Sequence, residues 1–328
     1  MTNQISTMFL SDVSVVDHAF IDNEGKIIGG SFNPCFLVSG EIDPQEKVVV
    51  DFSTVKKSIK EIIDHKETGF DHKLWIIEGW SDCEVIETEV TADSGNTYNS
   101  LYIMSPVVSL CVPVNAVKRA HISDLNMSSF DYYKHEDVAV WFNYYLQMEM
   151  QNRYPNINIK IETEITENMH HIFKSNPNRS DLIRFRYTHG LKDSTSWGCQ
   201  NIAHGHLSYM FVEYDPSAAT TINKLMIKDI VNQQLEHVAQ ELHNVVFINK
   251  ENLIDNSDNQ LSYETKRGLF SELLSLDDIN TVVLETETTI EFIVEYIKQT
   301  FDPSFVKLYG IKTLYVSEGL SKGAMVYF

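Results

Sequence analysis

The chain has 328 residues, of which 43% are hydrophobic and 22% charged, an ordinary globular composition with room for two domains. Its formal net charge of −20 argues against nucleic-acid binding, which needs Lys and Arg facing phosphates. No apolar run approaches the roughly 20 residues that span a bilayer, and the N-terminus does not read as a signal peptide. Four cysteines without paired spacing favour a reducing compartment. We therefore expect a cytoplasmic protein without membrane contact.

The first half of the chain reads as a hairpin, a helix, a second helix and a closing strand. Apolar residues at strand spacing and at helical spacing define these elements. They are strands over 13–20 and 35–42, helices over 55–63 and 138–146, and a strand over 157–161. Asp51 or Ser53 is a plausible N-cap for the first helix. The residues over 92–131 read as a long middle loop, and the closing strand runs into Glu162.

The second half repeats this plan. Its expected elements are strands over 182–189 and 207–214, helices over 227–242 and 290–297, a polar loop over 255–265 between them, and a strand over 311–316 that ends near Glu318. The order in each half is β-β-α-α-β-β, which indicates an internal duplication. Two antiparallel sheets with paired helices on one face predict the α+β class.

A histidine pair near the start of the second half carries the strongest chemical signal. His204 and His206 alternate with Gly205, so on a strand both imidazoles lie on one face. A third imidazole, from His189, would complete a zinc site with one position left for substrate. Cys199 beside such a site is a candidate acid/base or nucleophile. The alternative is two surface histidines that happen to flank a glycine.

The order of these motifs resembles the 6-pyruvoyl- and 6-carboxytetrahydropterin synthases. The resemblance rests on five segments: Asp51-Phe52, Asp71-His72-x-Leu74, a strand ending Glu162-Thr163, Cys199-x4-His204-Gly205-His206, and the helix start Thr288-Thr289-Ile290-Glu291. It implies two tandem tunnelling-fold (T-fold) modules, residues 1–168 and 169–328. Each module would be an antiparallel sheet with two helices on one face, and modules assemble side by side into a β-barrel. Because two modules cannot close a barrel, a homo-oligomer follows.

The resemblance also implies roles for individual residues. His189, His204 and His206 would bind Zn2+, and Cys199 would be the acid/base thiol. Asp71 and His72 would form the partner pair, contributed by the other module.

A glutamate at the end of a closing strand, Glu318 or Glu162, would anchor the pterin ring through paired hydrogen bonds. Taken singly, Asp71 could be a turn residue, His72 a surface side chain and Glu162 an ordinary charge on an edge strand.

The two halves have complementary defects under this alignment. In the first, His18 lies near the first ligand position but Gly30 replaces the second histidine of the pair. In the second, His243 stands where the Asp-His pair would end, without the aspartate. One complete site would therefore form between the halves, which favours retained catalysis.

The expected activity is that of a zinc-dependent carbon–oxygen lyase. It would convert 7,8-dihydroneopterin triphosphate to 6-carboxy-5,6,7,8-tetrahydropterin in the queuosine (7-deazaguanine) pathway. The alternatives are a 6-pyruvoyltetrahydropterin synthase, which eliminates the triphosphate, and a noncatalytic zinc-stabilised pterin-binding or scaffold protein. A bimodular protein resembling urate oxidase needs no metal, so the histidine triad argues against it.

Overall fold

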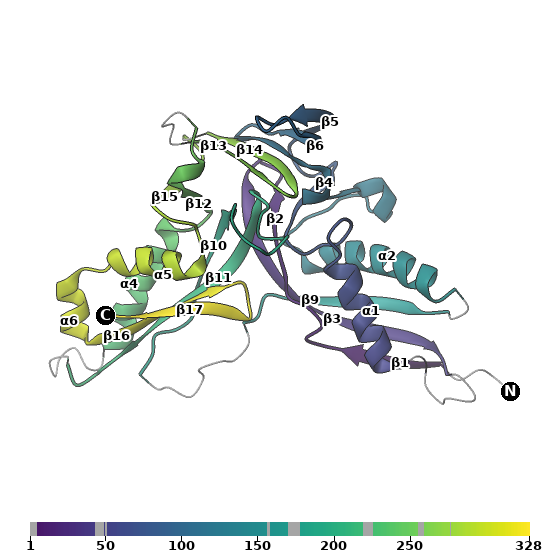
Figure 1. Cartoon of the computed structure of the whole chain (residues 1–328). Coiled ribbons are helices and arrows are strands. Elements are labelled where there is room, and N and C mark those ends of the chain that lie inside the picture. Colours follow the sequence, from purple (N-terminus) through teal and green to yellow (C-terminus); the bar gives the residue numbers. More distant parts are fainter. Residues whose placement is uncertain are drawn as a thin grey trace.

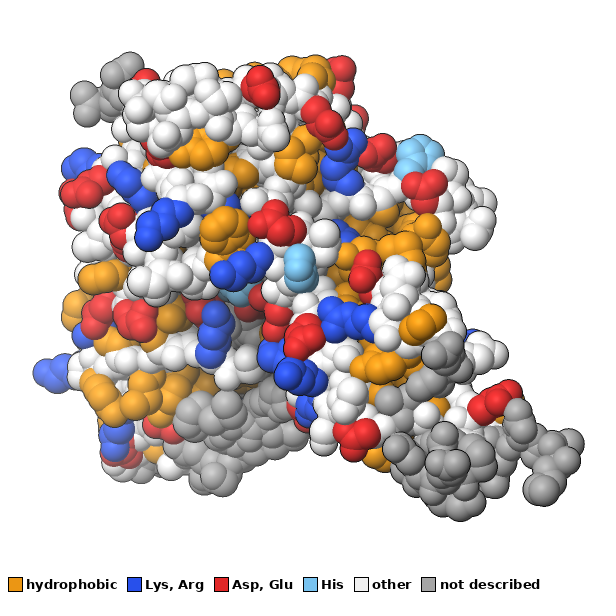
Figure 2. All heavy atoms as spheres, turned by 45° about the vertical axis from the view of Figure 1, so that its right-hand side comes forward, with side chains coloured by type: hydrophobic (Ala, Val, Ile, Leu, Met, Phe, Trp, Pro, Cys, Tyr) orange, Lys and Arg blue, Asp and Glu red, His pale blue; other side chains and the backbone are white. Residues whose placement is uncertain are grey.

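The computed structural model describes residues 5–42, 49, 51–155, 158–169, 178–218, 226–254, 259–275 and 277–328. Two sheets of six strands are each covered by helices on one face, and a third sheet of five strands lies where they meet (Figure 1). No helix in the described ranges is long and apolar enough to cross a membrane. On the face shown in Figure 2, basic side chains are interspersed with acidic ones and with hydrophobic patches.

The first sheet belongs to the N-terminal half and has the order β1-β3-β2-β4-β8, with β9 also pairing with β3. Its strands are β1 (Ile5–Leu10), β2 (Val16–Ile21), β3 (Ile27–Glu41), β4 (Lys73–Glu78), β8 (Val117–His121) and β9 (Lys160–Thr166). The helices α1 (Phe52–Ile63) and α2 (His135–Arg153) pack on it through one apolar cluster. Asp51, not Ser53, caps α1, because its side chain accepts from Thr54 N at 2.8 Å.

The second sheet belongs to the C-terminal half and has the order β15-β12-β10-β11-β16-β17. Its strands are β10 (Ile183–His189), β11 (His204–Tyr214), β12 (Val245–Asn249), β15 (Thr281–Leu284), β16 (Ile311–Glu318) and β17 (Lys322–Tyr327). The helices α4 (Ile227–Glu241), α5 (Ile290–Gln299) and α6 (Pro303–Tyr309) lie in this half (Figure 1). Residues from α4 and α5 form its apolar core with the sheet.

Five strands follow the same order in both sheets, β8-β4-β2-β3-β9 and β15-β12-β10-β11-β16. Both sheets are mixed, so the expectation of purely antiparallel sheets is wrong. The β2–β4, β4–β8, β10–β12 and β12–β15 pairs are parallel. In the β2–β4 and β10–β12 pairs, the helix after each hairpin carries the chain back across the sheet, so that the next strand runs parallel to the first hairpin strand. In the β4–β8 and β12–β15 pairs, the connection between the parallel strands contains strands β5–β7 and β13–β14.

The third sheet lies where loops were expected. Its strands are β5 (Glu84–Thr91), β6 (Thr97–Met104), β7 (Val108–Pro113), β13 (Gln260–Thr265) and β14 (Gly268–Leu274). The β7–β14 pair joins the two halves. Residues 255–258, part of the expected polar loop, lie outside the described residues, as do 156 and 157 at the expected start of the last strand of the first half. Short 3-10 turns occupy Val114–Ala116, Ile122–Leu125 and Lys250–Asn252.

The two large sheets touch where β3 crosses β11. A Cβ atom added to Gly205 would lie 2.7 Å from the Gly29 Cα atom, and one added to Gly29 would lie 2.0 Å from the Tyr187 carbonyl oxygen. Only residues without a Cβ atom allow the two backbones to come this close. This crossing brings β2 against β11, and β3 against both β10 and β11.

Candidate metal and catalytic site

Three histidines converge at the inner end of the β10–β11 hairpin. His189 lies opposite His204 in the ladder, and Tyr187 lies opposite His206. All three imidazoles are buried, with one nitrogen of each within 4.8 Å of the others. The His189 and His206 Nε2 atoms lie 3.1 Å apart. The structure therefore brings together the three residues that the sequence suggested as metal ligands.

Backbone carbonyl groups orient two of these rings. His189 Nδ1 donates to the Thr288 carbonyl oxygen at 2.7 Å, and His204 Nδ1 donates to the Asn201 carbonyl oxygen at 2.7 Å. Their Nε2 atoms therefore carry lone pairs, and the buried His204 Nε2 has no partner among the described residues.

Neutral imidazoles at this spacing are the donor set that zinc prefers. Burial, with the charge of His206, lowers the pKa of His189 to about 3. Burial likewise holds the pKa of His204 well below its ordinary value, so both rings stay uncharged. The residues present fit a zinc ion held through Nε2 atoms.

Asp17, from the first half, contacts this cluster and was missed from the sequence. Its Oδ1 atom lies 3.3 Å from His206 Nδ1 and accepts from Ser31 Oγ at 2.6 Å. The His206 contact is electrostatic rather than an aligned hydrogen bond. Burial alone would raise the pKa of Asp17, but His206 and His72 outweigh it and lower the pKa. A charged residue inside the fully buried strand β2 was the available signal.

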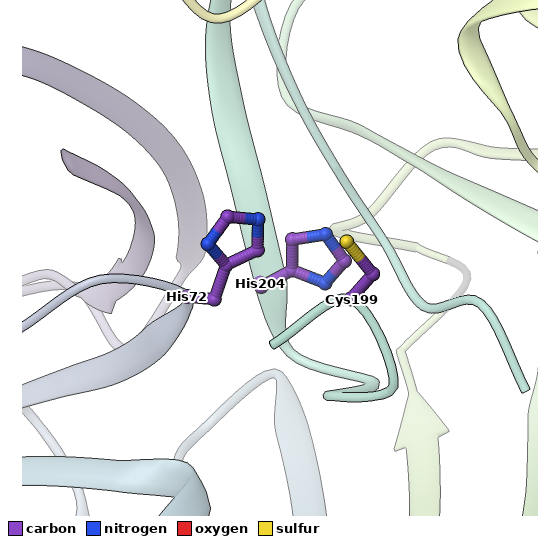
Figure 3. Close-up of side chains that lie close together, drawn as sticks. All are labelled: His72, Cys199 and His204. Atoms are coloured by element: carbon purple, nitrogen blue, oxygen red, sulfur yellow. The ribbon is translucent and has the colours of Figure 1, made fainter. Parts of the chain in front are cut away.

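Cys199 lies beside the histidines, next to His72 from the first half (Figure 3). Cys199 Sγ and one nitrogen each of His72 and His204 lie within 4.8 Å of one another. His72 Nδ1 donates to Asp71 Oδ2 at 2.7 Å, and the buried His72 Nε2 has no hydrogen-bond partner among the described residues. The structure thus forms an Asp71–His72–Cys199 series across the two halves.

His72 and Cys199 shift each other's pKa in opposite directions. Burial alone would lower the pKa of His72, but Asp71 and Cys199 outweigh it and raise the pKa well above its ordinary value. Burial raises the pKa of Cys199, and the nearby His72 outweighs burial and lowers it. These opposite shifts in pKa favour the thiolate form of Cys199 beside His72.

The backbone around His72 is held in an unusual conformation. His72 has a φ of 54°, in the left-handed region. Its N–H donates to the Asp17 carbonyl oxygen at 2.6 Å, and Asp71 Oδ1 accepts from Asp17 N at 2.9 Å. A Cβ atom on Gly198 would lie 2.6 Å from the His72 Cβ atom, so a glycine is needed there. Asn201 Nδ2 also donates to the His72 carbonyl oxygen at 3.2 Å.

The structure brings one of the two candidate glutamates to the cluster. Glu318 Oε1 lies 3.9 Å from His206 Nε2, and Glu318 Oε2 accepts from Lys322 Nζ at 2.8 Å. Burial raises the pKa of Glu318, but His206 and Lys322 outweigh it and lower the pKa to about 2.

Glu162 is a correction, because it lies 51% exposed on β9 and pairs with Lys160, away from the histidines. The strand registers, Pro34 with Ile165 and Met210 with Val316, make Glu167 the counterpart of Glu318.

The structure also changes two further pairings in the alignment of the two halves. His18 lies opposite Gly30, as Tyr187 lies opposite His206, so His18 is not the counterpart of a ligand. Its Nε2 atom bonds to the Tyr132 hydroxyl at 2.6 Å.

Asn244, not His243, is the counterpart of His72. Both have a left-handed φ, and the Asn244 N–H donates to the Arg186 carbonyl oxygen as the His72 N–H donates to that of Asp17. Arg186 is thus the counterpart of Asp17.

The chain matches no family model and no curated protein sequence. A solved catalytic-residue mutant of Plasmodium vivax 6-pyruvoyltetrahydropterin synthase is 15% identical, with a TM-score of 0.31 over 49% of this chain and 92% of that chain. The unmodified Plasmodium vivax enzyme gives 13% identity, a TM-score of 0.31, and 50% and 98% coverage. Plasmodium falciparum 6-pyruvoyl tetrahydropterin synthase is 15% identical, with a TM-score of 0.30 over 50% of this chain and 98% of that chain. Similarity at this level leaves function to be inferred from the site itself.

Proposed function

We propose that the chain is a zinc-dependent carbon–oxygen lyase of the 6-carboxytetrahydropterin synthase type. Its substrate would be 7,8-dihydroneopterin triphosphate and its product 6-carboxy-5,6,7,8-tetrahydropterin, a step of the queuosine (7-deazaguanine) pathway. One observation carries the proposal: three buried imidazoles meet the Asp71–His72–Cys199 series at the contact between the two halves. A metal site and an activated thiol in one cluster suit proton movements on a hydroxylated side chain.

The proposed roles of the residues follow from where they lie. Bound through His189, His204 and His206, zinc would supply Lewis acidity toward the hydroxyl groups of the substrate. Cys199 moves protons at the side-chain carbons, and His72, oriented by Asp71, returns a proton to the thiolate through Nε2.

Glu318 accepts hydrogen bonds from the amino group and ring N–H of the pterin. Lys322, at 2.8 Å, keeps Glu318 ionised for that purpose.

The proposal includes two T-fold modules, residues 1–168 and 169–328. The strand order shared by the two large sheets supports this division. Module two would supply the zinc ligands, Cys199 and Glu318, and module one would supply Asp17, Asp71 and His72.

Zinc content and product formation test the proposal separately. Protein purified without added metal should contain about one zinc per chain by elemental analysis. The double variant His204→Ala, His206→Ala should lose the zinc, whereas His237→Ala, an exposed histidine on α4, should keep it. Zinc that survives the double substitution would refute the site.

With 7,8-dihydroneopterin triphosphate, mass spectrometry should show the 6-carboxy product. A 6-pyruvoyl product would assign the elimination reaction instead. Zinc without turnover would identify a pterin-binding scaffold and refute the enzyme.

A further inference from the structure

A cavity of about 220 Å³ lies beside Asp71 and His72, and its lining does not include His189, His204 or His206. Asp71 and His72 form part of its wall, and the rest includes Lys66, Lys73, Trp197 and Arg267. The last two come from the second half, so this cavity too lies between the halves. A ligand group placed here would be next to His72.

Two of the wall residues are buried cations. Lys73 is 2% exposed and Arg267 is 4% exposed. Both donate to the Asn115 carbonyl oxygen, Arg267 through Nη2 at 2.8 Å. Neither forms an ion pair with a carboxylate within the described ranges, although buried charges are normally paired. Burial and the charge of Arg267 lower the pKa of Lys73 to about 7, as expected for two cations that repel each other.

The indole N–H of Trp197 is a further hydrogen-bond donor at this cavity. Its Nε1 atom is buried and has no hydrogen-bond partner among the residues described. The Lys66 ammonium lies 5.5 Å from the Trp197 ring centroid, and the Arg267 guanidinium carbon lies 5.6 Å from it. Buried donors without acceptors are rare in folded proteins, so an acceptor is expected here.

The carboxylates at this cavity are already engaged and do not fill that role. Asp71 accepts from Asp17 N at 2.9 Å and from His72 at 2.7 Å. Asp64 accepts from Lys60 Nζ and from Ser14 Oγ at 2.8 Å. The buried cations of this cavity donate to protein oxygens but have no free carboxylate beside them, and the Trp197 N–H has no acceptor among the described residues.

We propose that the cavity bounded by Lys66, Lys73, Trp197 and Arg267 is a phosphate subsite. It rests on the proposed function, in which the substrate carries a triphosphate, and it places that group beside His72. A phosphate oxygen would accept from Trp197 Nε1, and its charge would relieve the repulsion between Lys73 and Arg267. Free inorganic phosphates share this chemistry, and the experiment separates the two.

Binding of tripolyphosphate, measured by isothermal titration calorimetry without a pterin, tests the subsite directly. Trp197→Phe keeps an aromatic ring but removes the N–H donor, and it should weaken binding by roughly tenfold, the scale of a hydrogen bond to a charged group. Lys66→Ala should weaken binding several-fold. The matched control Lys57→Ala removes an exposed lysine of α1 outside the cavity and should change binding less than twofold.

Two further arms exclude other sources of signal. Binding should persist in the His204→Ala, His206→Ala variant, which excludes chelation of a bound metal. The KM for dihydroneopterin triphosphate should rise in Trp197→Phe, while that for dihydroneopterin without phosphate should not.

Absence of tripolyphosphate binding, or equal binding by all variants, would overturn the subsite. If no pterin is turned over, the proposed function fails, but the calorimetry still decides the subsite.

Discussion

Cys199 and His72 face each other across the two halves of the chain, so we expect them to act as one unit. Cys199→Ala and His72→Ala should each lower turnover by roughly 10²-fold or more, the scale for a positioned acid/base. The double variant should lose much less than the product of the two effects, because both residues serve one proton transfer. Steady-state kinetics, with zinc content and circular dichroism as checks on folding, would measure this.

The control for this prediction is His243→Ala, which should be nearly silent. His243 is exposed near the end of α4, and its neighbour Asn244 occupies the position that His72 has in the first half. Loss of activity in His243→Ala with full activity in His72→Ala would place the site within the second half and contradict the assignment.

The buried side chain of Glu272 should make the stability of the chain depend on pH. It is 1% exposed, and neither carboxylate oxygen has a hydrogen-bond partner among the described residues. Burial raises the pKa of Glu272 to about 8. Between its unfolded pKa of about 4.5 and 8, the folded chain holds a proton that the unfolded chain has lost, so stability falls as pH rises through this window. The slope is up to about 1.4 kcal/mol per pH unit.

Glu272→Gln should therefore be more stable than the parent chain at pH 8, and this advantage should shrink toward pH 5. Urea unfolding at several pH values measures it, with the exposed Glu285→Gln as the control. A Gln variant that shows the same pH slope as the parent chain would contradict a buried neutral acid.

At the scale of elements, the crossing of β3 and β11 holds the site together. A Cβ atom on Gly205 would lie 2.4 Å from the Tyr187 carbonyl oxygen and 2.7 Å from the Gly29 Cα atom, both backbone atoms that cannot rotate away. Gly205→Ala should lower the free energy of unfolding by roughly 1–3 kcal/mol, the range for overpacking. It should also lower zinc content, because His204 and His206 flank it. Gly95→Ala, in an open turn with a φ of 85°, should lose some stability but keep its zinc.

The elements that sequence periodicity predicted are those whose signal is local. The apolar faces of α1, α4 and α5 repeat at helical spacing, and His204 and His206 share a face because they are two apart on one strand. The third sheet was missed because strands such as β5 expose most of their residues and because β7 pairs with β14 from the other half. Nothing local in the sequence marks such a pairing.

The same reasoning explains the errors within the site. Choosing Glu162 over Glu167 required the register of β9 on β3, and choosing His243 over Asn244 required the backbone conformation after α4. Asp17 reaches His206 only through the contact between the halves. Candidate residues that lie on one strand could therefore be predicted from the sequence. The register between strands and the contacts between the two halves could not.

Across the whole molecule, the two halves offer two related positions, and only one has the groups for chemistry. At the other position Arg186 replaces Asp17 and pairs with Glu167, the counterpart of Glu318, at 2.7 Å. That position therefore has a buried arginine where the first has an aspartate. The Tyr132 ring stacks on the Phe20 ring with 3.4 Å between their centroids, and the Tyr132 hydroxyl forms a hydrogen bond with His18. Aromatic side chains therefore occupy this second position. From this asymmetry we expect one zinc and one pterin per chain if the proposed function is right.

The free edges of the large sheets predict assembly. Among the described residues, β1 pairs only with β3 and β17 only with β16. Large apolar side chains lie exposed on both strands, with Phe9 73%, Ile5 70% and Tyr327 65% exposed. Exposed apolar edge strands favour pairing with another chain. We expect a homo-oligomer, with three chains supplying six sheet modules, and multi-angle light scattering at micromolar concentration should give about three times 37.7 kDa.

Charged substitutions on these edges should break the assembly without removing the metal. Phe9→Glu and Tyr327→Glu place a carboxylate at each edge and should shift the mass toward one chain. Leu308→Glu, at an apolar residue that is 45% exposed on α6, should not. All three proposed zinc ligands and the Asp71–His72–Cys199 series belong to one chain, so we expect the dissociated variants still to hold about one zinc. A parent chain that is monomeric at micromolar concentration would refute the assembly. Loss of zinc on dissociation would show instead that a neighbouring chain completes the site.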